Sequence, residues 1–289
     1  MISDITLGQF FPGNSPIHKL DPRTKILLAI AYIVAVFLAD SPVAFLFLIL
    51  FSVVIVLISR ISMRVILRAI RPILFILIFT ALSSLLMTVG EDEPLVSFWI
   101  IRIYTEGIYR AVLMGIRVIL LIIGSSVLLT YTTSPIALTD GIESLLSPLK
   151  LFHIPVHIFA MMMSIALRFI PTLIEETEKI MNAQKSRGAD FTTGSIVKRA
   201  KALIPLLVPL VISAFKRADE LATAMECRCY RGDKKRTKLV KLQMHARDFL
   251  FFAVFAALIA AVVLLRIFTP AILERLPGAF WQIVFHRIR

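Results

Sequence analysis

One short pattern occurs twice between Ser134 and Arg247. Its two copies are Ala183-Gln184-Lys185-Ser186-Arg187-Gly188 and Ala224-Met225-Glu226-Cys227-Arg228-Cys229. Both copies read Ala-x-x-small-Arg-small, and each closes a helical-looking run that contains proline, begins apolar and turns charged toward its end. Two matched helix ends of this kind predict two docking elements for two similar partner surfaces. The residues of these elements are Ser186, Arg187, Gly188, Cys227, Arg228 and Cys229.

The composition indicates an integral membrane protein. Of the 289 residues, 58% are hydrophobic, and the mean hydropathy is +0.86, whereas soluble domains are only about half apolar. The formal charge of +13 is concentrated in segments that flank apolar runs, as in cytoplasmic loops. We therefore expect a lipid bilayer, and no nucleic acid, among the partners. We also expect no cleavable signal peptide, because polar and turn residues precede the first apolar run.

Five apolar runs predict transmembrane helices, so the expected fold is an all-α, polytopic membrane protein. The runs lie at about Lys25–Ala39, Val43–Ser59, Pro72–Val89, Ile108–Tyr131 and Phe249–Phe268. Between the second and third runs, arginines recur every three or four residues from Arg60 to Arg71. This spacing predicts a helix with one basic face at the cytoplasmic membrane surface.

The distribution of charge predicts the orientation in the membrane. Basic residues place the N-terminus, the 60–71 loop and residues 132–248 in the cytoplasm, and the acidic 90–106 loop outside. Three parts are expected: an N-terminal membrane part with four spans (1–131), a cytoplasmic or inner-leaflet coupling region (132–248), and a final span with its tail (249–289). The side of the tail stays open, because five spans place it outside, against its own positive charge.

Three long coupling helices are expected in residues 132–248, at about 135–150, 155–187 and 196–229. The apolar runs 158–170 and 203–215 are short for membrane spans, so we expect these parts to lie obliquely in the inner leaflet. A hairpin of two further spans is the alternative.

The first coupling helix is amphipathic and the second begins with three methionines. Asp140 and Glu143 lie on one side of the first helix, and apolar residues lie on the other: Ile142, Leu145, Leu146 and Leu149. The methionines Met161, Met162 and Met163 either fill a core or form a surface that repacks against different partners.

No motif in the sequence indicates a catalytic centre, an ATP-binding site or an ion-coupling site. It lacks Gly-x-x-x-x-Gly-Lys-Ser/Thr, His-Glu-x-x-His and Gly-x-Ser-x-Gly, and the predicted spans hold no central carboxylate or lysine. Its two cysteines are separated by one residue, too close for an ordinary structural disulfide, and no metal-spaced His/Cys cluster accompanies them. We therefore expect no enzyme activity, and energy supplied by a partner.

For a single arginine, favourable interaction with the negative end of its own helix would suffice as an explanation. Recurrence of the same helix end favours docking instead. The guanidinium group offers five donors in a planar fork, which suits partner carboxylates or exposed helix-end carbonyls. Small neighbours let a partner surface approach closely.

The paired arginine elements resemble the two signatures of the transmembrane T component of energy-coupling factor (ECF) transporters, the EcfT/CbiQ-like family. Further matches are Leu20-Asp21-Pro22-Arg23-Thr24-Lys25, Asp140-Gly141-Ile142-Glu143-Ser144-Leu145-Leu146 and Tyr230-Arg231-Gly232. The resemblance covers nearly the whole chain. One departure is Cys-Arg-Cys in the second signature, where the family often has Ala-Arg-Gly.

The resemblance implies a multi-pass scaffold of the cell membrane that couples two ABC-type ATPase subunits, one at each arginine, to a small substrate-binding membrane subunit. It implies no cofactor in this chain, and contacts to the small subunit through Leu145, Leu146, Leu149, Met161, Met162 and Met163. Vitamins are the expected substrates; a dedicated cobalt or nickel importer is the alternative within the family. Rivals of other classes are a self-sufficient secondary transporter and a membrane enzyme or anchor.

Overall fold

The computed structural model describes residues 10–88, 96–98, 101–189, 191, 195–230, 232 and 242–273. These residues form helices and one two-stranded hairpin. The first elements are α1 (Pro22–Leu38), α2 (Pro42–Ser59), α3 (Met63–Ile70), η1 (Arg71–Ile73), α4 (Leu74–Met87), β1 (Val96–Phe98) and β2 (Ile101–Ile103). They are followed by α5 (Thr105–Ser125), η2 (Ser126–Tyr131), α6 (Pro135–Leu145), η3 (Ser147–Phe152), α7 (Val156–Ser186), α8 (Ile196–Cys227) and α9 (Ala246–Leu273).

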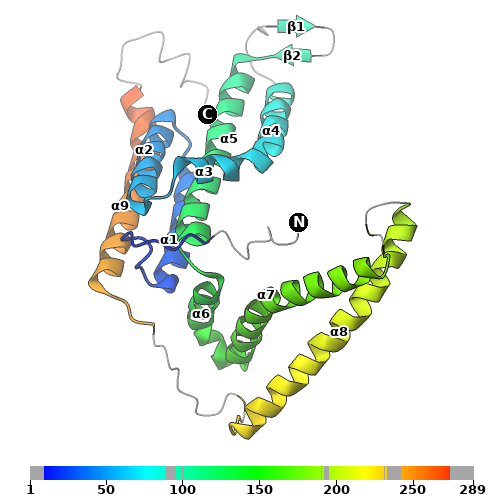
Figure 1. Ribbon diagram of the computed structural model, residues 1–289. Coiled ribbons are helices and arrows are strands. Elements are labelled where there is room, and N and C mark those ends of the chain that lie inside the picture. The colour runs from blue at the N-terminus through cyan, green and yellow to red at the C-terminus, as the bar shows by residue number, and fades with distance from the viewer. Residues whose placement is uncertain are drawn as a thin grey trace. The chain divides into compact units, whose positions relative to one another are not determined.

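The chain divides into two compact units, which we call the bundle unit and the arm unit. The bundle unit contains Phe10–Ser134 and the chain from Leu242 onward, and the arm unit contains Pro135–Lys241. Within the bundle unit, α1 packs against α9, α5 and η2, and α2 packs against α5 (Figure 1). The side chains buried where these helices meet are apolar and large: Leu28, Tyr32, Val36, Phe45, Leu48, Leu128, Tyr131, Phe255 and Val262.

A glycine allows α1 and α5 to approach closely. A Cβ placed on Gly124 of α5 would collide with the ring of Tyr32 on α1. The hydroxyl group of Tyr32 lies 2.7 Å from Oγ of Ser52 on α2 and donates to the carbonyl oxygen of Leu120 at 3.2 Å. One buried tyrosine therefore links three helices and satisfies its own polar atom.

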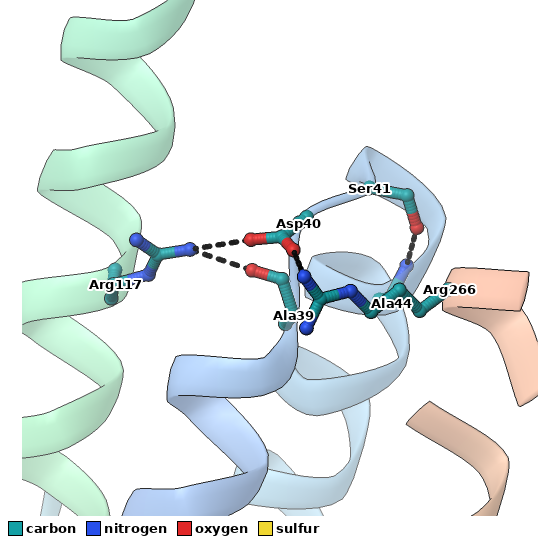
Figure 2. Close-up of polar contacts among 6 residues, drawn as sticks. All are labelled: Ala39, Asp40, Ser41, Ala44, Arg117 and Arg266. Carbon is teal, nitrogen blue, oxygen red and sulfur yellow. Dashed lines mark hydrogen bonds and ion pairs between the residues drawn. The ribbon is translucent and has the colours of Figure 1, made fainter. Parts of the chain in front are cut away.

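The turn between α1 and α2 carries an ion-pair network (Figure 2). Nη2 of Arg117 donates to the carbonyl oxygen of Ala39 at 2.6 Å and lies 3.5 Å from Oδ1 of Asp40. Nη2 of Arg266 on α9 lies 3.0 Å from Oδ2 of the same carboxylate. Ser41 begins α2 by accepting the N–H of Ala44, and Pro42 occupies the first turn. The network ties α5 and α9 to this turn.

The basic segment after α2 differs in part from its prediction. Arg60 is not on the predicted helix face, because it adopts a left-handed conformation (φ 56°) that ends α2. Helix α3 begins only at Met63, so Arg64 and Arg68 lie within it and Arg71 lies at its end. Arg64, Arg68 and Arg71 are exposed, and Ile66 on the opposite face of α3 is buried.

The connection between α4 and α5, expected as a plain loop, contains an antiparallel pairing of β1 with β2, in which Val96 faces Ile103. β-branched and aromatic residues favour this conformation. The acidic residues Glu91, Asp92 and Glu93, on which the predicted orientation of this loop rests, lie outside the described residues.

In the arm unit, α6 packs on α7, and α7 packs on α8 (Figure 1). The first coupling helix is shorter than predicted, because α6 ends at Leu145 and the chain continues as the 3-10 segment η3. Pro148 explains the break, since it lacks an N–H for the helix ladder and disfavours helical backbone at Ser147. Helices α7 and α8 have nearly the predicted bounds and continue through Pro171, Pro205 and Pro209.

Five described helical stretches are long and apolar enough to cross a membrane: Pro42–Ser59, Met63–Met87, Thr105–Tyr131, Val156–Ser186 and Ala246–Phe268. The all-α polytopic prediction is confirmed, and four of these stretches contain predicted spans. The set is not the predicted one, however. Val156–Ser186, expected as an oblique helix, qualifies by length and composition. Helix α1, the first predicted span, has 17 residues, at the lower limit of roughly 17 for a span.

The bundle unit also has the surface of a membrane protein. Large apolar side chains project outward from α2, α4 and α9. The most exposed include Leu46, Leu50, Leu57, Phe75, Phe79, Met87, Phe249 and Leu250. Such broad apolar surfaces are avoided in water and are expected against lipid or another membrane protein.

Candidate functional site

The first predicted docking element is a regular helix-capping motif at the end of α7. The N–H of Ala189 donates to the carbonyl oxygen of Gln184 at 3.0 Å, and that of Gly188 donates to Lys185 at 2.9 Å. These are the two bonds of a Schellman motif, with Arg187 as the last residue before the left-handed position. Gly188 occupies that position at φ 87°, where glycine has no steric penalty.

The second predicted element has the same structure at the end of α8. The N–H of Tyr230 donates to the carbonyl oxygen of Met225 at 3.0 Å, and that of Cys229 donates to Glu226 at 2.8 Å. Arg228 thus takes the place of Arg187, and Cys229 takes that of Gly188, in the left-handed region at φ 57°. A residue with a Cβ is destabilised there by about 1 kcal/mol relative to glycine. The capping hydrogen bonds form nevertheless, so the sequence difference leaves the geometry unchanged.

Both arginines are available to a partner. Arg187 and Arg228 are exposed, as are their small neighbours Ser186, Gly188, Cys227 and Cys229. Among the described residues neither guanidinium group has an ion pair, and both cysteines are free thiols. Two unpaired, exposed guanidinium groups at the negative ends of two helices can each bind a carboxylate or a group of carbonyl oxygens.

The packing of α7 on α8 separates the two ends. Nη2 of Arg217 on α8 lies 3.3 Å from Oε2 of Glu176, and Nε2 of Gln184 donates to the carbonyl oxygen of Pro205 at 3.5 Å. A later residue of α7 therefore meets an earlier residue of α8, so the helices are antiparallel (Figure 1). At about 1.5 Å of rise per residue, Arg228 lies roughly 35 Å along α8 from the Pro205 level, where α7 ends. The two arginines can contact two separate partners.

The contact between Gln184 and Pro205 has a local cause. In a regular helix the carbonyl oxygen of Pro205 would accept the N–H of residue 209, but that residue is also proline and has none. The amide of Gln184 supplies the missing donor. A side chain one turn before Arg187 thereby fixes the end of α7 on α8.

The residues predicted to contact a second membrane protein are only partly accessible. Leu146, Met162 and Met163 are 41%, 48% and 53% exposed, whereas Leu145, Leu149 and Met161 are half-buried. Met162 and Met163 therefore do not fill a core formed by the residues that the structure describes, and their contact with a partner stays a prediction. Leu149 lies in η3, so it does not continue the helical face that Leu145 and Leu146 share.

Helix α6 turns its acidic side inward. Glu143 is buried, and its Oε1 lies 2.9 Å from Nδ1 of His157 on α7. Ile142 and Leu146 on the other side are exposed. The contact with α7 therefore includes a polar pair, and Ile142 and Leu146 are left for another surface.

Comparison with known sequences identifies the family of this chain. The family model described as cobalt transport protein, CbiQ, matches residues 13–239. The proteins named energy-coupling factor transporter transmembrane protein EcfT from Clostridium kluyveri and Ruminiclostridium cellulolyticum are 48% and 51% identical, over 92% of this chain and 98% of theirs. That of Acidaminococcus fermentans is 51% identical over 94% of this chain and 100% of its own.

The chain belongs to the EcfT/CbiQ family. As a member, it is a multi-pass transport protein of the membrane, in agreement with its candidate spans.

Three contacts of this EcfT/CbiQ chain were not predicted from its sequence: Glu143 with His157, Glu176 with Arg217, and Gln184 with Pro205. The contact of Gln184 with Pro205 could have been predicted in part, because two prolines four residues apart in a helix leave one carbonyl oxygen without a backbone donor. The other two join residues on different helices, and no local pattern encodes them.

Proposed function

We propose that this chain is the energy-coupling scaffold of an ECF-type importer, in which Arg187 and Arg228 each dock one of two ABC-type ATPase subunits. ATP-driven closure of the ATPases moves the two helix ends, and α7 and α8 pass the motion to a small membrane subunit that has captured the substrate. The docking elements and the arm unit lie in the cytoplasm or at the inner leaflet. This chain needs no cofactor of its own, since its partners hydrolyse the ATP.

The observation that carries the proposal is the repetition of one capping motif with one exposed arginine in each copy. A helix end stabilised only by its own arginine does not need the same small neighbours twice. The planar fork of a guanidinium group makes several hydrogen bonds to partner carbonyl or carboxylate oxygens, so it loses less side-chain entropy per bond than a lysine would. The separation of roughly 35 Å along α8 gives each ATPase subunit its own contact.

The exposed apolar residues of the arm unit support a contact with the capture subunit. Ile142 and Leu146 on α6, and Met162 and Met163 on α7, are exposed in this chain. Methionine side chains adapt to surfaces of different shape, which suits one scaffold serving several capture subunits. Vitamins are the proposed substrates, because the resemblance to ECF transporters implies them for a scaffold that is shared in this way. The description of the matching family favours a second candidate, a cobalt importer with one dedicated capture subunit.

The proposal is tested with the complex purified after coexpression with its ATPase and capture subunits, and with cells supplied with tritiated vitamins or radioactive cobalt(II). Arg187→Ala combined with Arg228→Ala should release the ATPases or leave ATP hydrolysis without uptake. Arg168→Ala is the matched control, because it removes an exposed arginine from within α7, away from its end. Normal uptake by a stably assembled double variant would rule the docking role out, and the label taken up distinguishes the two substrate classes.

A further inference from the structure

A buried polar cluster joins three helix ends of the bundle unit. It contains Asp21 before α1, Lys25 in its first turn, Thr132 after η2, and Asp248 in the first turn of α9. Lys25 and Asp248 are only 2% and 1% exposed. Charged groups are rarely buried to this extent unless their partners are fixed.

One carboxylate in this cluster holds two helix N-termini. Oδ2 of Asp248 accepts the N–H of His245, the residue before α9, at 2.7 Å, as the third residue of a capping box does. Oδ1 of Asp248 accepts the N–H of Asp21, the residue before α1, at 3.0 Å. The carboxylate of Asp21 in turn accepts the N–H of Arg23. Both helices therefore present their positive ends to Asp248.

One ammonium group holds the third helix end. Nζ of Lys25 donates to the carbonyl oxygen of Thr132 at 2.7 Å and to that of His18 at 3.1 Å. The carbonyl of Thr132 belongs to the last turn of a helix, where acceptors lack partners and carry partial negative charge. The carboxylates of Asp21 and Asp248 also attract Lys25. The cluster thus links α1 to α5 through Lys25 and to α9 through Asp248.

The cluster lies beside both points at which the chain crosses between the bundle unit and residues 135–241 of the arm unit. The chain leaves the bundle unit after Ser134 and returns to it at Leu242. Thr132 precedes the first crossing by two residues, and His245 follows the second by three. Both connections to the arm unit, which carries Arg187 and Arg228, therefore begin at residues that one buried cluster ties to the start of α1.

We propose that Lys25 and Asp248 are positioning residues that anchor both ends of the arm unit, so that α1, α5 and α9 respond as one body when the arm is moved. This inference rests on the proposed coupling function. A load applied through these two connections reaches the helices only if their attachment points do not yield. Without the cluster, the first turns of α1 and α9 would open separately, and the movement would be lost there.

The test uses the complete complex in proteoliposomes and two variants. Lys25→Met keeps an unbranched side chain but has no donor for Thr132. Asp248→Asn has a single acceptor oxygen, so the N–H of either Asp21 or His245 loses its partner. Asp40→Asn is the matched control, because Asp40 bridges two arginines of the same unit at the other end of α1.

Three quantities are measured: the number of ATPase subunits copurified per chain, the ATP hydrolysed per labelled vitamin or cobalt(II) ion taken up, and amide hydrogen exchange around residues 21 and 245. We expect unchanged copurification, about tenfold more ATP hydrolysed per substrate, and exchange about tenfold faster at both sites. Asp40→Asn should leave the ATP-to-substrate ratio as it is.

A normal ATP-to-substrate ratio despite faster exchange would overturn the inference, and so would loss of the ATPases, which would give the cluster a role in assembly. Should Lys25→Met fail to accumulate, the milder Asp248→Asn variant decides. If the Arg187→Ala and Arg228→Ala double variant stays coupled while the cluster variants do not, the docking proposal fails and the anchor remains.

Discussion

Gly188 and Cys229 occupy the same left-handed position in two copies of one helix-capping motif, at φ 87° and φ 57°. Each N–H closes the same turn, to Lys185 in one copy and to Glu226 in the other. Glycine fills this position without strain, whereas the Cβ of cysteine is disfavoured there. The second helix end therefore keeps its geometry although its sequence does not favour it.

This difference predicts opposite effects of two substitutions. Cys229→Gly should stabilise the end of α8, and Gly188→Ala should destabilise the end of α7, each by about 1 kcal/mol, or about fivefold in local opening. Within the described part of the chain no atom lies within 4 Å of a Cβ at Gly188, so the expected change comes from its backbone conformation. Amide exchange of Tyr230 and Ala189, which close the two motifs, measures both effects. Equal exchange in all variants would contradict the assignment.

Two glycines of α5 should differ sharply when replaced by alanine. A Cβ at Gly124 would collide with the buried ring of Tyr32, whereas a Cβ at Gly115 meets no atom of the described residues within 4 Å. Gly124→Ala should therefore destabilise the bundle unit by roughly 1–3 kcal/mol, and Gly115→Ala should be neutral or stabilising by up to about 1 kcal/mol. Thermal unfolding of the two variants in the same detergent compares them. Similar unfolding temperatures would show that α1 and α5 are not in close contact there.

The buried pair of Glu143 and His157 should respond asymmetrically to substitution. His157→Leu removes the ring nitrogen that lies 2.9 Å from the buried carboxylate of Glu143, and should destabilise the protein by about 1–3 kcal/mol. Adding Glu143→Leu removes the buried charge and should restore part of the loss. The unfolding midpoints of the two single variants and the double variant give the coupling between the residues. Additive losses would mean that the pair is not formed.

Acid should weaken the segment before α1 through His18. Burial lowers the pKa of His18 below its ordinary value of 6.5; the nearby Lys25 ammonium also lowers it, and a hydrogen bond to the carbonyl oxygen of Phe11 opposes them. The unfolded chain therefore binds the proton more tightly, so stability is full above pH 6.5 and falls as the pH drops toward the lowered pKa. His18→Gln should lose less stability than the wild type between pH 7.5 and 5.5. The remaining histidines contribute equally to both proteins, so an identical pH dependence would refute this assignment.

The sequence predicted the helices well where local signals set their bounds. Ser41-Pro42 begins α2 one residue before the predicted Val43, and Gly188 follows α7 at its predicted end, because caps and prolines act over a few residues. Helix α1 begins at Pro22, three residues before the predicted Lys25. It failed where two local signals competed. Pro148 ended α6 before the amphipathic pattern ended, and the left-handed Arg60 interrupted the arginine spacing.

The role of the two helix ends in docking stays a prediction, whereas the structure shows what holds them. Repetition pointed to Arg187 and Arg228, whereas the left-handed conformation of Cys229 contradicts local preference. Asp248 and Asp21 are far apart in the chain and meet only after folding. Pairing between distant helices depends on tertiary packing, which periodicity along one helix does not encode.

The central claim is that both helix ends contact ATPase subunits, and site-specific cross-linking tests it most directly. Cys227 in a Cys229→Gly background and Ser186→Cys in a background without native thiols place one short photo-cross-linker at the equivalent position of each motif. An exposed site within α7, Ala166→Cys, serves as the control. The account predicts a cross-link to an ATPase subunit from each helix end and none from the control. Labels at both ends that react only within this chain, while the intact complex is present, would contradict it.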